Sequence, residues 1–478
     1  MTGRLDSRTD AGARAEEEST ATGLVRGVRW LTVSTLVLSL LNYVYSLGLT
    51  HLLDVGAFAV FAAGQALLLT AGTVSNAAVP WVLAQTLSTA TGAEDRRRAV
   101  WFGLTLNTGL GVLGGALLYG LGLGFAGPRT SLVLAVATFL VFVASSTVGV
   151  LQGARRFGLL GVLKVGDSAL KIAVGLALVA VGTGAAGALG GFAAGSLLLI
   201  AAGGWVARRD LRRPVRGTLR APHLWRTTAG VGAVQALLSL LVTLDVVLVA
   251  YLLPDEAAAT YQASMILSRV PLFLAGAVAA TVFPLLSRDP DGLEDVVRRA
   301  VRSFLLMVVP YAVALACVPA PLLALVFPPE YSRMSVVLPL TAVAGAAIGA
   351  VNLVTTVFQA RRRYVRSVVA QVAGLAVHAG ALTVGAALDG LVGMAVGAVV
   401  GTTASLVALL VAAPARWRRA LVPTPDVLAL GAAVVPVFVL LQPWPWAWVP
   451  VVGTTGLAAA VVALRGRPPR VRTGRAAT

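Results

Sequence analysis

Apolar segments long enough to cross a membrane recur along nearly the whole chain. A helix that crosses a bilayer needs about 20 mostly apolar residues, and windows of that length give fourteen segments. They lie at approximately 30–52, 55–78, 99–120, 130–152, 160–183, 185–207, 228–253, 257–286, 302–326, 335–359, 366–388, 391–413, 426–442 and 446–464. Only 12% of the 478 residues are charged, whereas soluble domains carry about 25%. The sequence therefore predicts an all-α polytopic membrane protein.

The positions of the basic residues support this count and predict an orientation. If the N-terminus is cytoplasmic, 33 of the 38 Lys and Arg residues fall in cytoplasmic loops or tails, and only Arg129 and Arg333 fall in outer loops. Lys and Arg accumulate on the cytoplasmic side of membrane proteins. We therefore expect both termini to be cytoplasmic. The net charge of +18 then needs no nucleic-acid partner.

The two ends of the chain are polar. Residues 1–27 lack the apolar core of a secretory signal peptide, and we expect a disordered cytoplasmic tail there. Residues 465–478 are expected to form a basic cytoplasmic tail. The single cysteine, Cys317, excludes an intrachain disulfide and argues against a Cys-based metal site. No metal or cofactor is expected.

A short sequence motif, called a phrase below, occurs twice in this chain. VLQGARRFG begins at Val150 and VFQARRRYV begins at Val357, an offset of 207 residues. A second pair, HLLDVGAFAVF from His51 and YLLPDEAAATY from Tyr251, recurs at an offset of 200. The paired phrases keep their order and are six spans apart, which predicts two six-helix repeats. Because six is even, both repeats enter the membrane in the same direction. Parallel repeats of this kind are a transporter architecture.

These observations predict a division of the chain into lobes and tails. The predicted parts are a tail at 1–27, an N-terminal six-helix lobe at 28–207, a basic cytoplasmic linker at 208–226, a C-terminal six-helix lobe at 227–413, two extra transmembrane helices at 414–464 and a tail at 465–478.

Several phrases together resemble the polysaccharide-export flippases. The phrases are LLDVGAFAVF, VLQGARRF, LDVVLVAYLL, YQASMILSRVPLFLAGAVAATVFPLLSR, LLALVFPPEY and VFQARRRY. This Wzx-like family belongs to the superfamily that also contains the MATE drug exporters and the lipid II flippases, and the resemblance covers residues 28–410. It implies two six-helix bundles around a V-shaped cavity. It also implies a bacterial plasma-membrane protein that moves polyprenyl-pyrophosphate-linked oligosaccharides between leaflets.

Three ionisable residues share one face of the fifth span. Lys164, Asp167 and Lys171 are spaced by three and four residues, which places them together on a helix. Ionisable groups inside a membrane usually mark a transport path. One interpretation is a cationic wall that binds the pyrophosphate. The other is an Asp167–Lys171 pair that only hydrates a cavity.

A second charged position lies in the eighth span. Arg269 falls near the middle of this span, and its planar guanidinium suits a phosphate. Asp245 in the seventh span is a possible ion-pair partner. Within the spans, the charges of Lys164, Lys171 and Arg269 minus those of Asp167 and Asp245 leave a net charge of +1. This sign suits an anionic cargo better than a cationic drug.

Three further polar residues are candidates. His378 in the eleventh span could carry a coupling proton, or it could be a packing residue with a hydrogen-bond partner. Asn42 and Tyr45 in the first span could bind sugar, although packing between helices would explain them as well. We also expect Pro271 to kink the eighth span.

The sequence argues against an enzyme. It contains no nucleotide-binding loop, metal-ligand spacing or catalytic triad pattern. The outer loops, of about ten residues or fewer, are too short to build the site of a glycan polymerase. The leading hypothesis is therefore a flippase whose partners are a lipid-linked glycan, membrane lipids and polysaccharide-assembly proteins. The alternatives are a multidrug or metabolite cation antiporter and a lipid II flippase.

Overall fold

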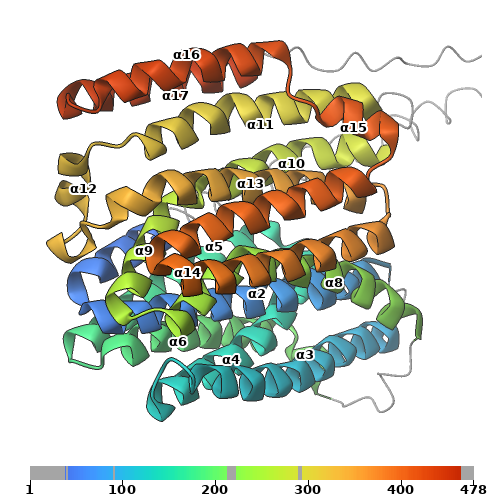
Figure 1. The fold of residues 1–478 in the computed structure, drawn as a ribbon. Helices are drawn as coiled ribbons and strands as arrows, with labels where there is room; N and C mark the ends of the chain where they lie inside the picture. The colour runs from blue at the N-terminus through green and yellow to red at the C-terminus, as the bar shows by residue number, and fades with distance from the viewer. Residues whose placement is uncertain (1–37, 39–40, 90–91, 213–221, 289–292, 465–478) are drawn as a thin grey trace, which may run out of the picture. The chain divides into compact units, whose positions relative to one another are not determined.

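The computed structural model describes residues 38, 41–89, 92–212, 222–288 and 293–464, and every regular element among them is a helix (Figure 1). The predicted tails at 1–27 and 465–478 lie outside the described residues, as do residues 213–221 of the predicted linker. The described residues of the first predicted span are helical at 41–52.

The helices form two compact units. The first unit contains residues up to 48 and 71–229, and the second contains 49–70 and 230–478. After the helix at 41–52, the elements are α2 (Val55–Thr89), α3 (Ala93–Gly122), α4 (Pro128–Gly153), α5 (Phe157–Ala180), α6 (Gly184–Val206), α7 (Arg208–Leu211), α8 (Pro222–Leu252), α9 (Asp255–Ser268), α10 (Val270–Arg288), α11 (Leu293–Ala316), α12 (Ala320–Val326), the 3-10 turn η1 (Pro329–Tyr331), α13 (Met334–Ala360), α14 (Tyr364–Ala412), α15 (Ala415–Leu421), α16 (Pro425–Leu441) and α17 (Pro445–Leu464). The division into lobes at 28–207 and 227–413 stays a prediction.

The fold class predicted from the sequence is confirmed. In the part of the chain that the structure describes, ten helices are long and apolar enough to cross a membrane. One of them, α14, holds two predicted spans, because two helices follow one another without a loop across a sharp turn at Asp389 and Gly390. Gly390 has φ 51° and ψ −120°, a conformation that glycine adopts most easily. The predicted span 302–326 is instead divided, because α11 ends at Ala316 and α12 follows after Pro319.

The repeated phrase forms the same turn twice. Arg155 has φ 55° and Arg362 has φ 52°, and they are the only non-glycine residues with positive φ in the described chain. Each turn is closed by the same two backbone hydrogen bonds of 2.9–3.0 Å: Arg155 N to Gln152 O and Arg156 N to Leu151 O in the first copy, Arg362 N to Gln359 O and Arg363 N to Phe358 O in the second. This is a Schellman-type helix end with arginine where glycine is usual. The sequence repeat is therefore also a repeat of backbone geometry.

The last helices of the second unit pack against α11. In Figure 1, α16 and α17 lie beside α11, and both contact it. The short helix α15 also contacts α11 and buries Trp417. In the first unit, the short helix α7 contacts α3 in the corresponding way. Each unit therefore ends its sixth span with a short helix that packs on its third.

Within α14, the two antiparallel halves approach closely along a row of small residues. A Cβ atom placed on Gly374, Gly393 or Gly401 would overlap atoms of the facing half: those of Ser405, Gly385 and His378, respectively. Small residues of this kind let membrane helices pack backbone to backbone. The row fixes the position of His378 within the second unit.

Candidate functional site

Lys171 is the centre of the candidate site in the first unit. It lies on α5 and is 6% exposed. Its Nζ donates a hydrogen bond to Asn42 Oδ1. It also lies 4.6 Å from the centroid of the Phe192 ring and 5.9 Å from that of Tyr45, within the range of a cation–π interaction. An amide and two aromatic rings thus surround a buried ammonium group.

The carboxylate nearest in sequence does not pair directly with this lysine. No salt bridge within 4 Å joins Lys171 to Asp167 in the described part of the chain. Asp167 nevertheless interacts electrostatically with both Lys171 and Lys164. Its side chain packs against α6, where a Cβ on Gly195 would overlap Asp167 Oδ1. The second interpretation of this face, an Asp167–Lys171 pair, therefore has no direct ion pair in the structure.

Asn42 and Tyr45 support Lys171 from the first helix. Asn42 Nδ2 donates to Leu38 O at 2.8 Å, which turns the amide oxygen of Asn42 toward the lysine. The Tyr45 hydroxyl donates to Ala188 O at 2.9 Å, and its ring is 2% exposed. Both predicted residues thus lie beside Lys171, with polar groups engaged by the protein.

The candidate site of the second unit forms at a break between α9 and α10. Pro271 cannot donate a hydrogen bond to the carbonyl of Leu267 one turn earlier, and the Tyr311 hydroxyl donates to that oxygen at 2.7 Å. The helix ends at Ser268 and resumes at Val270, so Arg269 occupies the elbow between them. The kink expected from Pro271 thus coincides with a one-residue break between α9 and α10.

Arg269 lies beside Asp245 at this elbow. Its Nη2 is 3.6 Å from Asp245 Oδ1 and donates to Val242 O at 2.8 Å. Asp245 is 1% exposed and also accepts hydrogen bonds from Tyr261 Oη at 3.0 Å and Val246 N at 2.8 Å. The ion pair that the sequence allowed is present. Arg269 Nε is buried without a hydrogen-bond partner among the described residues.

His378 is fully buried in the second unit. Neither ring nitrogen has a hydrogen-bond partner within the described residues, so the expected backbone or hydroxyl partner is not found there. The ring lies against Gly401 and close enough to Asp245 to interact electrostatically.

Lys171 and His378 occupy equivalent positions in the two units. Each is the fifteenth residue of its helix, since α5 begins at Phe157 and α14 at Tyr364. They are therefore separated by the same 207 residues as the repeated phrase. The two repeats place a lysine in one unit and a histidine in the other at the same depth of the fifth helix.

Two aromatic neighbours were missed by sequence reasoning. Phe192 on α6 carries no pattern that distinguishes it from packing residues. Tyr261 did leave a signal, because the repeat aligns it with Phe61, and a hydroxyl added at a buried position needs a partner. That partner is Asp245. Across the described residues, no cluster of three His, Cys, Asp or Glu side chains is arranged to hold a metal ion.

The sequence matches one family over more than half of its length. Residues 24–289 match the family described as polysaccharide biosynthesis protein. The chain belongs to this family. The resemblance predicted from its phrases is thereby confirmed. No curated protein matches the sequence.

Several solved structures share the architecture of this chain over most of its length. The lipid II flippase MurJ in an inward closed conformation has a TM-score of 0.73 and 12% identity, over 91% of this chain and 97% of that chain. An inward-facing multidrug resistance MATE family transporter of the MOP superfamily has a TM-score of 0.60 and 16% identity, over 85% and 98%. A MATE transporter from Vibrio cholerae has a TM-score of 0.55 and 20% identity, over 84% of this chain and 97% of that chain. At these identities the likeness shows the fold, which is that of polytopic transporters.

Proposed function

We propose that this protein is a flippase that moves a polyprenyl-pyrophosphate-linked oligosaccharide across the bacterial plasma membrane for cell-surface polysaccharide synthesis. Its family is one of polysaccharide biosynthesis, and its fold is shared with proteins named as a flippase and as transporters. The mechanism is alternating access of the two predicted lobes. The glycan and pyrophosphate cross through the protein while the prenyl chain stays in lipid.

The buried ammonium of Lys171 is the observation that carries this proposal. A buried charge is costly unless it is compensated, and within a membrane such a group usually belongs to a transport path. The rings of Phe192 and Tyr45 compensate Lys171 only in part. A pyrophosphate oxygen would complete the charge balance. Binding of an anion is therefore more favourable here than binding of a cationic drug.

The neighbouring residues then have defined roles. Asn42 and Tyr45 hold the lysine side chain in place, since both contact it. Lys164 is nearer the predicted cytoplasmic end of α5 and attracts the anion as it arrives, while Asp167 limits how tightly the anion is held.

Arg269 provides a second, weaker contact for the anion. Asp245 already neutralises much of its charge, but Arg269 Nε has no partner among the described residues. A small shift of the side chain would expose this N–H to a phosphate oxygen or a sugar hydroxyl. His378 stays the candidate for a coupling proton, because an unperturbed imidazole changes its charge near neutral pH.

The experiment that tests this function is a flipping assay in liposomes. The purified protein is reconstituted with a fluorescent polyprenyl-pyrophosphate oligosaccharide, and its movement is followed by loss of protection from an external quencher. We expect Lys171→Gln to slow flipping at least about tenfold, the effect of losing roughly one charge-assisted hydrogen bond. Arg129→Gln is the matched control, because it removes an exposed positive charge at the start of α4.

The outcomes separate the alternatives. Equal flipping by Lys171→Gln and Arg129→Gln would refute the anion site. No flipping of the oligosaccharide, together with proton-driven uptake of cationic drugs, would indicate an antiporter. Flipping restricted to lipid II would indicate a cell-wall function. We also propose that both termini are cytoplasmic and that polysaccharide-assembly proteins are partners, which tagging of each terminus and cross-linking in cells would test.

A further inference from the structure

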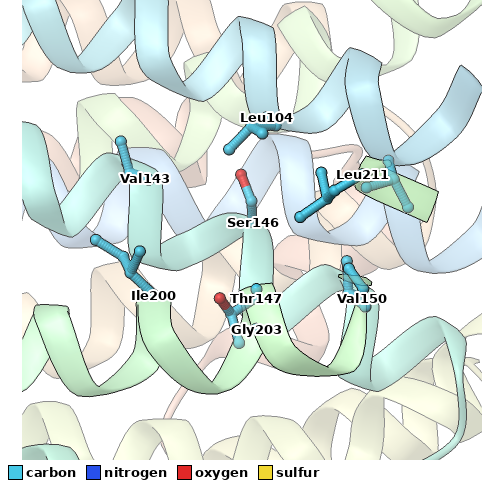
Figure 2. A pocket seen from close by; sticks show the side chains of 11 residues that line it. Leu104, Val143, Ser146, Thr147, Val150, Ile200, Gly203 and Leu211 are labelled. Atoms are coloured by element: carbon cyan, nitrogen blue, oxygen red, sulfur yellow. The ribbon is translucent and has the colours of Figure 1, made fainter. Parts of the chain in front are cut away.

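The first unit contains an apolar groove away from Lys171. It lies between α3, α4 and α6 and has a volume of about 170 Å³. Figure 2 shows Leu104, Val143, Val150 and Ile200 around it, with Leu211 of α7 at one end. A cavity of about 150 Å³ accommodates a six-carbon ring, so this groove accommodates a short length of alkyl chain.

The groove has almost no free polar groups. Ser146 and Thr147 are the hydroxyl residues in its wall (Figure 2). The Ser146 hydroxyl donates to Gly103 O at 3.3 Å, and that of Thr147 donates to Leu199 O at 2.9 Å. Because these hydroxyl hydrogens are bonded to backbone, the wall is suited to hydrocarbon and poorly suited to a sugar.

One end of the groove is strongly basic. Residues 93–98 and 207–212 contain six arginines and three carboxylates. Two of the carboxylates are already paired, Asp210 with Arg96 at 3.2 Å and Glu94 with Arg98 at 2.5 Å. Arg208 stacks over the exposed Trp205 at 5.3 Å, a combination typical of the membrane interface. The remaining arginines provide an excess of positive charge at this end of the groove.

We propose that this groove binds one acyl chain of an anionic glycerophospholipid, whose phosphate lies among the arginines of residues 93–98 and 207–212. The apolar wall accounts for the chain, and the excess of arginine accounts for the anionic headgroup. This phospholipid is a resident lipid of the first unit, separate from the transported glycan.

Native mass spectrometry of the full-length protein in neutral detergent tests this proposal. The protein is titrated with phosphatidylglycerol, phosphatidylcholine and a polyprenyl phosphate. Gly204→Leu fills the groove, since Gly204 lines it and a Cβ there meets nothing within 4 Å. Gly120→Leu is the matched control, because Gly120 also has open space around its Cβ position and lies at the other end of α3.

We expect one tight phosphatidylglycerol on the wild type and on Gly120→Leu, and at least about tenfold weaker binding to Gly204→Leu, since excluding even two methylenes has an effect of that size. Replacing both Arg208 and Arg209 with Gln should abolish the preference over phosphatidylcholine. If Gly204→Leu does not fold, Leu211→Trp replaces it, since Leu211 lines the groove and an indole there would occupy part of its volume. Undiminished binding to the groove-filling variant would overturn the proposal. So would displacement of phosphatidylglycerol by the polyprenyl phosphate, which would make the groove a cargo site.

Discussion

The elbow that carries Arg269 depends on a close contact with α13. A Cβ on Gly349 would lie 2.8 Å from Pro271 O and 2.9 Å from Phe304 Cζ. Comfortable contacts begin near 3.5 Å, so Gly349→Ala must separate these helices by about 0.5 Å or more. Overpacking of this kind costs about 1–3 kcal/mol. The same displacement would move the backbone next to Arg269, whose side chain makes the 2.8 Å hydrogen bond to Val242 O, and hydrogen bonds of this type are favourable only up to about 3.2 Å.

Thermal unfolding and flipping of the same preparations measure this effect. Gly349→Ala should melt at a lower temperature than the wild type and flip the labelled oligosaccharide more slowly. Gly276→Ala on α10 is the control, since a Cβ there meets nothing within 4 Å, and alanine favours a helix over glycine by about 1 kcal/mol. If Gly349→Ala melts and transports like Gly276→Ala, contact with α13 does not hold the elbow and the reasoning fails.

Two further predictions concern the repeat. Arg155→Gly and Arg362→Gly should each melt at a higher temperature than the corresponding Ala variant, because a left-handed conformation costs a residue with a side chain about 1–2 kcal/mol; a less stable Gly variant would contradict the backbone geometry. His378→Gln should flatten the pH dependence of flipping between about pH 5 and 8 if this histidine carries the coupling proton, and an unchanged pH profile of initial rates would assign it to packing alone.

The sequence was sufficient for the approximate positions of most helices in the described part of the chain, although the predicted span 302–326 is divided between α11 and α12. Each span is a long apolar run, and its ends are marked by charge or by residues such as Gly182, which has φ 83°. The predicted span 426–442 and the observed helix Pro425–Leu441 differ by one residue at each end. Because a membrane-crossing helix is recognised by a run of about 20 mostly apolar residues, tertiary contacts were not needed to place it.

The contacts within the candidate sites could not be predicted from the sequence. Asn42 and Lys171 are separated by 129 residues, and no local rule predicts which distant helix provides a partner. The same holds for Phe192, which lies in an apolar helix like any packing residue. The Arg269–Asp245 pair could be stated only as a possibility, because spacing along two helices does not fix their rotation. The equivalence of Lys171 and His378 was available from the repeat, but it became evident only when both helix starts were known.

The close packing within α14 limits how the second unit can move. The two halves meet where Gly385 and Gly393 bring their backbones together, and again at His378 and Gly401. Sliding one half along the other by a single residue would drive side chains into backbone at these contacts. We therefore expect the two halves of α14 to move together as one rigid body during a transport cycle. Bending would then be confined to helix ends outside this hairpin.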